Sequence, residues 1–166
     1  MDKTIIIRLE ELKGVVRDPG NGYGFTKYYA GGSAEHSKVS FYELPPHHSN
    51  YPYHWHCDCD EVFYILSGEG IVRTPDGERP IKAGDLIICP SGEGGAHKIT
   101  NTSDSQVLRY IDFDTVCPRD VCVYPDSNKV GIWGDPLNRV YRIGDNVDYY
   151  EGEASGEYSP SETPEG

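Results

Sequence analysis

Short segments rich in β-branched and aromatic residues follow one another from Lys38 to Thr115, and turn-forming residues separate them at regular intervals. The segments are KVSFYEL, YPYHWH, EVFYILS, GIVRT, ERPIKAG, DLIICP, AHKITN and QVLRYIDF. Asp76-Gly77 is the strongest turn signal between them, because glycine adopts a positive φ at little steric cost. Many short strands at even spacing are typical of an all-β sandwich or barrel. The chain also holds 19 Gly and 12 Pro in 166 residues, which disfavours long helices.

The pattern predicts further segments before and after residues 38–115. We expect residues 1–37 to be an N-terminal extension packed on the barrel, 38–115 to be the barrel core, 116–150 to form C-terminal strands or a wrapping segment, and 151–166 to be an acidic flexible tail. The tail holds five Glu and neither Lys nor Arg. Its few apolar residues cannot offset the entropy cost of ordering it. Within the N-terminal extension, NGYGFTKYYAGGSAEH is typical of a loop or edge ribbon, and TIIIRLEEL of a strand running into a helical turn.

Charge and cysteine usage narrow the class of protein. The net charge of −12 disfavours nucleic acid and anionic membrane surfaces as partners. No apolar run approaches the roughly 20 residues of a membrane span, and the N-terminus lacks the apolar region of a signal peptide, which predicts a cytoplasmic protein. Five cysteines, without a repeated C-x-x-C spacing, indicate reduced thiols rather than a disulfide framework.

Three histidines and one glutamate carry the strongest chemical signal. His54 and His56 are two positions apart in a strand-like segment, so the two-residue period of a strand places both imidazoles on one face. Glu61 opens the next apolar segment, and His97 follows a Pro-Gly turn. Converging imidazoles and a carboxylate suit one divalent transition metal per chain (Zn, Fe, Mn or Ni), with a position left open for water or substrate.

The sequence resembles the cupin superfamily at two motifs. The first, H-x-H, three or four residues, E, six residues and G, is matched at His54, His56, Glu61 and Gly68. The second, G, five residues, P-x-G, two residues, H, three residues and N, is matched at Gly84, Pro90, Gly92, His97 and Asn101. There are two departures. His48 stands where the family has a leading Gly, and four residues rather than two separate Gly92 from His97.

The resemblance implies a double-stranded β-helix, the cupin jelly-roll barrel, with a metal site made of three His and one Glu. The chain looks most like small single-domain cupins that are labelled sugar-phosphate isomerase-like by analogy. The resemblance to cupins does not imply a particular reaction, because cupins include isomerases, dioxygenases, decarboxylases and plain ligand binders.

We expect a metal-dependent enzyme, isomerase- or oxygenase-like, that acts on a small polar metabolite. In such an enzyme Glu61 could also carry a proton. A non-catalytic cupin that binds or senses a small molecule is the alternative. If the substrate is a sugar phosphate, the candidate cations for its phosphate are Arg73, Lys82, Lys98 and Arg109.

A zinc site that includes Cys57 and Cys59 is a competing interpretation, since thiolates are preferred ligands of structural zinc. The alternation counts against it: if His54 and His56 point inward, Cys57 points outward, and Glu61 is left without a role.

The same alternation predicts which side chains face inward and which face outward. From Glu61 it places Phe63 and Ile65 on the wall of the cavity. Large apolar side chains are expected on the outer surface at Tyr53, Trp55, Tyr64 and Leu66. Because a soluble monomer rarely exposes so much apolar area, we expect a homodimer that pairs through the outer sheet.

Overall fold

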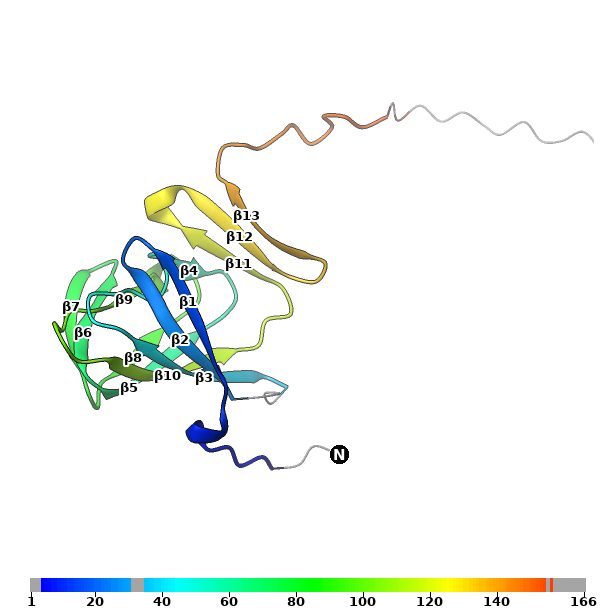
Figure 1. Cartoon of the computed structure of the whole chain (residues 1–166). Coiled ribbons are helices and arrows are strands. Elements are labelled where there is room, and N and C mark those ends of the chain that lie inside the picture. Colours follow the sequence, from blue (N-terminus) through cyan, green and yellow to red (C-terminus); the bar gives the residue numbers. More distant parts are fainter. Residues whose placement is uncertain (1–3, 31–34, 155, 157–166) are drawn as a thin grey trace, which may run out of the picture.

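The computed structural model of the chain describes residues 4–30, 35–154 and 156, and these residues form an all-β jelly roll (Figure 1). The fold class expected from the sequence is thus confirmed. The strands are β1 (Gly14–Gly20), β2 (Tyr23–Tyr29), β3 (Ser37–Leu44), β4 (Trp55–His56), β5 (Glu61–Ser67), β6 (Glu69–Thr74), β7 (Gly77–Lys82), β8 (Leu86–Cys89), β9 (Lys98–Asn101), β10 (Leu108–Thr115), β11 (Asp120–Tyr124), β12 (Lys129–Gly134) and β13 (Leu137–Arg142). Three single 3-10 turns accompany them, η1 (Leu9–Glu11), η2 (Glu93–Gly95) and η3 (Pro125–Ser127).

The strands pair into a large sheet and two smaller ones. The large sheet has the order β1-β2-β3-β10-β5-β8, and the smaller sheets have the orders β13-β12-β11-β4 and β7-β6-β9. Strand β10 lies between β3 and β5, so residues 42 to 78 positions apart become neighbours. In Figure 1 the sheet of β11, β12 and β13 lies above the rest of the barrel and reaches it through β4.

Two segments differ from the strands that the sequence pattern predicts. YPYHWH contributes only Trp55 and His56 to a strand, whereas His54 is held by an isolated bridge to His97. The N-terminal glycine- and tyrosine-rich segment forms β2, and β1 pairs with it as the edge strand. No strand precedes η1 in residues 4–8.

The hydrophobic core lies between the large sheet and the β7-β6-β9 sheet. Leu44, Ile65, Ile99 and Leu108 are fully buried there. Tyr42 and Tyr110 stack with ring centroids 5.0 Å apart, and the Asn50 side-chain amide donates a hydrogen bond to the Tyr110 hydroxyl at 3.1 Å. This packing fixes the inner face of β5 and β10, which also carries the acidic residues of the candidate site.

In the part of the chain that the structure describes, no helix has the length and apolarity to cross a membrane. Most of the expected flexible tail, namely residues 155 and 157–166, lies outside the described residues.

Candidate metal centre

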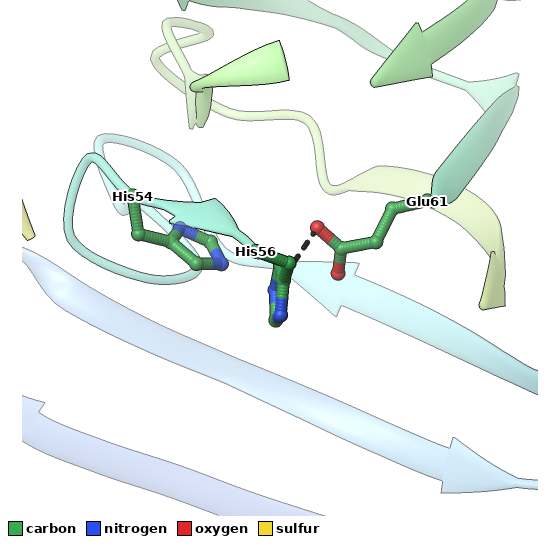
Figure 2. Close-up of side chains that lie close together, drawn as sticks. All are labelled: His54, His56 and Glu61. Carbon is green, nitrogen blue, oxygen red and sulfur yellow. Dashed lines mark ion pairs between the residues drawn. The ribbon is translucent and has the colours of Figure 1, made fainter. Parts of the chain in front are cut away.

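The four residues singled out in the sequence come from three places in the fold. His54 and His56 flank Trp55 in and beside β4, Glu61 is the first residue of β5, and His97 follows η2. The backbones of His54 and His97 are joined by reciprocal N–H···O hydrogen bonds of 3.1 and 2.9 Å. Figure 2 shows that the side chains of His54 and His56, in and beside β4, lie next to that of Glu61 at the start of β5.

The ligand atoms of three of these residues are close enough to share one ion, and the fourth residue, His97, contacts Glu61. Those of His54, His56 and Glu61 all lie within 4.8 Å of one another. Glu61 Oε2 is 3.3 Å from His56 Nε2 and 3.2 Å from His97 Nε2. Two donors that bind one ion at about 2.0–2.2 Å stand at such separations. His97 joins the group through Glu61, and its ring centroid is 4.8 Å from that of His54.

Two of these atoms are buried without a hydrogen-bond partner. Glu61 Oε2 and His97 Nε2 are both inaccessible, and neither makes a hydrogen bond in the described part of the chain. A buried polar atom without a partner is costly, and it is rare in native proteins unless water or an ion completes it. A metal ion bound between Glu61 Oε2 and His97 Nε2 would supply the missing partner of both atoms.

The other ring nitrogen of each histidine has a fixed partner. His54 Nδ1 lies 2.9 Å from the Pro52 carbonyl oxygen, and His97 Nδ1 lies 3.0 Å from the Gly95 carbonyl oxygen. His56 Nδ1 lies 2.5 Å from Asp120 Oδ2. An Nδ1–H that donates to such acceptors leaves Nε2 as the metal-binding atom, which is the usual arrangement around histidine ligands.

Asp120 and Cys122 are the part of this site that the sequence interpretation missed. Both lie on β11, and Cys122 is directly paired with His56. The Cys122 sulfur is 3.1 Å from His56 Nδ1, and the atoms of His56, Asp120 and Cys122 form a second compact group. The thiol beside the histidines is thus Cys122, and neither Cys57 nor Cys59 belongs to such a group in the described residues. No sequence signal predicts a pairing across 64 positions.

Burial and neighbouring charges shift the protonation of these groups. Burial, reinforced by the charge of His97, lowers the pKa of His54 to about 4, so this imidazole is neutral at pH 7. Burial raises the pKa of Glu61, but His56 and His97 outweigh that effect and bring it to about 2. Burial likewise lowers the pKa of His56, yet Asp120, Cys122 and Glu61 raise it well above its usual value. Without an ion, a protonated His56 therefore balances Glu61 and Asp120, and binding of a metal there releases a proton.

A cavity of about 350 Å³ opens beside this group. It is lined by Lys38, His56, Cys59, Glu61, Asp114, Thr115, Cys117, Pro118, Asp120, Trp133, Gly134 and Asn138. His56 and Glu61 thus connect the metal-ligand group to the cavity. Phe63 and Ile65 point inward as predicted and are buried, but they pack in the hydrophobic core and do not line this cavity.

The cations proposed for a phosphate group lie elsewhere. Arg73 binds Asp126 with two hydrogen bonds of 2.5 and 2.9 Å and stacks on the ring of Tyr53. Arg109 binds Glu43 at 2.7 Å, and neither Lys82 nor Lys98 lines the cavity. Tyr53 is buried and not exposed as expected, and the Arg73 guanidinium lies 4.0 Å from the centroid of its ring.

The sequence and the fold both have known relatives. The family model described as "Cupin domain" matches residues 40–114. An oxalate-binding protein of Thermotoga maritima is 38% identical over 77 residues, which cover 45% of this chain and 61% of that protein. The chain therefore spans about three fifths of the length of that curated relative.

Two solved structures share the fold at low sequence identity. A sugar phosphate isomerase from a cupin superfamily of Silicibacter pomeroyi superposes with a TM-score of 0.76 over 87% of this chain and 98% of that chain, at 19% identity. A predicted oxalate decarboxylase from Thermotoga maritima superposes with a TM-score of 0.54 over 68% of this chain and 100% of that chain, at 24% identity. The fold is thus a double-stranded β-helix.

Proposed function

We propose that the chain, whose residues 40–114 match the cupin domain model, is a metal-dependent enzyme acting on a small polar metabolite. His54, His56, Glu61 and His97 would hold one divalent transition metal. The observation that carries the proposal is that His56 and Glu61 belong both to the ligand group and to the wall of the cavity. A ligand in the cavity would thereby reach the ion directly.

A bound divalent ion would supply Lewis acidity toward a carbonyl, hydroxyl or carboxylate oxygen of the ligand. The chain's own residues would orient that ligand. Thr115 and Asn138 offer side-chain hydrogen bonds in the cavity, and Lys38 offers a positive charge. Glu61 stands at the boundary between the ligand group and the cavity, where a carboxylate can take up or return a proton.

The charge of the cavity favours a small chelating acid over a sugar phosphate. Its lining holds three carboxylates, Glu61, Asp114 and Asp120, against the single ammonium group of Lys38. A phosphate carries about two negative charges and needs several cations or backbone N–H groups to hold it. A hydroxy acid, keto acid or small dicarboxylate can instead place one acidic group on the ion and another near Lys38.

The ligand class can be tested by thermal unfolding. We expect the metal-loaded protein to be stabilised by oxalate and related small acids, with a Tm increase of about 5–10 °C at a ligand concentration near 100 Kd. The increase should vanish after metal removal and shrink in Lys38→Met. It should persist in the matched control Lys82→Met, which changes an exposed lysine outside the cavity. A response to sugar phosphates alone, undiminished in Lys38→Met, would contradict the proposed class.

A non-catalytic binding protein is the second candidate, because the curated relative is named for binding oxalate. The two functions differ in what happens to the ligand. Nuclear magnetic resonance of a stabilising ligand, incubated with the metal-loaded protein, separates them: an enzyme converts the ligand, whereas a carrier or sensor leaves its spectrum unchanged.

We also propose that the outer face of the large sheet pairs with a second copy of the chain. Two apolar rows cross this face through paired strands. One row is Phe41, Ile111, Tyr64 and Leu86, and the other is Val39, Phe113, Val62 and Ile88. Leu86 and Ile88 on β8 are 58% and 66% exposed. A contiguous apolar surface across four strands is typical of an interface, and a two-fold axis would match it to itself.

Disruption of this face should produce monomers. We expect light scattering at micromolar concentration to give a dimer mass for the wild-type chain and a monomer mass for Leu86→Lys with Ile88→Lys. Charges placed in the centre of an apolar interface are desolvated without a partner, so the dimer loses several kcal/mol. Val140→Lys with Tyr141→Lys, on the exposed strand β13, is the control and should remain dimeric. A monomeric wild-type chain would refute this assembly.

A further inference from the structure

A second group of possible ligands lies next to the histidine site and consists of carboxylates only. Oxygen atoms of Glu61, Asp112 and Asp114 all lie within 4.8 Å of one another. Asp114 is the direct cross-strand partner of Glu61, and Asp112 is two residues earlier on β10, so both aspartates face the barrel interior. The histidine group and this group share Glu61 and no other residue.

Each of these carboxylates has one inaccessible oxygen atom without a hydrogen-bond partner among the described residues. Asp112 is only 4% exposed. Asp112 Oδ1, Asp114 Oδ1 and Glu61 Oε2 are inaccessible, and none of them makes a hydrogen bond in the described part of the chain. An unpartnered carboxylate oxygen in a protein interior is costly unless a cation or a proton completes it.

Basic side chains do not neutralise the two aspartates by direct contact. Lys38 is the cross-strand partner of Asp114 on β3, yet no ion pair within 4.0 Å forms between these residues in the described structure. The Lys27 ammonium group lies over the rings of Tyr29 and Tyr42, at 5.0 and 4.8 Å from their centroids. Both lysines therefore act on the aspartates only at longer range.

The strand register places like charges opposite each other. Directly paired carboxylates destabilise an antiparallel strand pair, and burial strengthens their repulsion. Burial and the neighbouring Asp114 raise the pKa of Asp112 well above its usual value, which is another expression of the same uncompensated charge. A folded protein with this arrangement is stabilised by any cation that binds between the three carboxylates.

We propose that Glu61, Asp112 and Asp114 bind a second divalent cation, with Glu61 shared between this ion and the one held by the histidines. This second site rests on the proposed function because Glu61 would serve both ions. A donor set of carboxylate oxygens selects a hard cation such as Mn²⁺, Mg²⁺ or Ca²⁺, whereas imidazole donors select Zn, Fe or Ni. Glu61 and Asp114 line the cavity, which gives the cation a path of entry and room for the waters that complete its coordination.

The two sites can be counted in the full-length protein. After removal of metals with a chelator, the chain is loaded with Mn²⁺, desalted and analysed by plasma mass spectrometry. We expect two Mn²⁺ per wild-type chain and one per chain in Asp112→Asn with Asp114→Asn. Asp104→Asn, which changes an aspartate whose side chain is 96% exposed, is the matched control and should retain two.

Stability in chelator gives an independent readout. Because the substitutions remove repulsion and keep the side-chain shape, Asp114→Asn should unfold at the same or a higher temperature than the wild-type chain without metal. Mn²⁺ should then raise the Tm of Asp114→Asn less than that of the wild-type chain. If the double variant does not fold, Asp114→Asn alone decides the ion count.

The possible failures are distinguishable. One Mn²⁺ per chain in both the wild type and the aspartate variants would overturn the second site and leave a shared proton as the compensation for the aspartates. If His54→Ala and His56→Ala keep every ion while the aspartate variants lose one, the proposed histidine site fails and the carboxylate site stands.

Discussion

Replacement of either His54 or His56 by alanine is expected to weaken Zn²⁺ binding by more than about 100-fold and to leave the β fold intact. Loss of a residue that only orients a ligand costs about 10–100-fold in affinity, and loss of the ligand itself costs more. The fold should survive because the hydrophobic core between the large sheet and the β7-β6-β9 sheet contains neither histidine. Competition with a chromophoric chelator measures the affinity, and circular dichroism checks the fold.

Three controls limit the interpretation of that experiment. His47→Ala removes an exposed imidazole and should change nothing. Cys57→Ser with Cys59→Ser should also leave Zn²⁺ binding unchanged, and a loss there would favour the cysteine site over the histidine site. The effect of Asp120→Asn should be intermediate between those of the histidine variants and of these controls, with Zn²⁺ binding weakened by about 10–100-fold. The amide still fills the space of the carboxylate, but it no longer places a negative charge beside His56. Wild-type affinity in both histidine variants would contradict the site.

The barrel strands were predictable because their signals are local. Alternation along EVFYILS gives the inward direction of Phe63 and Ile65, and both are buried. The motif glycines Gly68, Gly84 and Gly92 have φ values of +85°, +93° and +89°, which side chains with a Cβ rarely adopt. The same alternation predicted that His54 and His56 share one face, and their ligand atoms do lie within 4.8 Å of each other and of Glu61.

The rest of the site depends on contacts between distant segments, which a periodicity cannot specify. Asp120 reaches His56 only because β11 pairs with β4, and Asp114 faces Glu61 only because β10 inserts between β3 and β5. The burial of Tyr53 was missed for a similar reason, because its ring contacts Arg73 on β6, which is distant in the sequence. The pattern within one segment thus gave the correct side-chain directions along β5, but it did not give the contacts made with distant segments.

The longer loop of the second motif gives the other large expected effect. Gly92 and His97 are separated by four residues, and Gly95 in this segment has no room for a side chain. A Cβ at Gly95 would stand 1.7 Å from the Pro90 carbonyl oxygen and 2.8 Å from the Pro90 carbonyl carbon, both of them backbone atoms. The carbonyl oxygen of Gly95 also accepts the hydrogen bond that orients His97. The close packing of this loop against Pro90 therefore fixes the orientation of the His97 imidazole.

Gly95→Ala is accordingly expected to lower stability by about 3 kcal/mol, because the clash forces the backbone to move. For a chain of this size that loss corresponds to a Tm decrease of about 6–12 °C, measurable by differential scanning calorimetry. Zn²⁺ affinity should fall as well, since His97 moves with the loop. Gly94→Ala is the matched control: a Cβ there meets nothing within 4 Å, so both stability and Zn²⁺ binding should stay near wild type. Equal effects of the two substitutions would mean that flexibility of the loop, and not its packing against Pro90, positions His97.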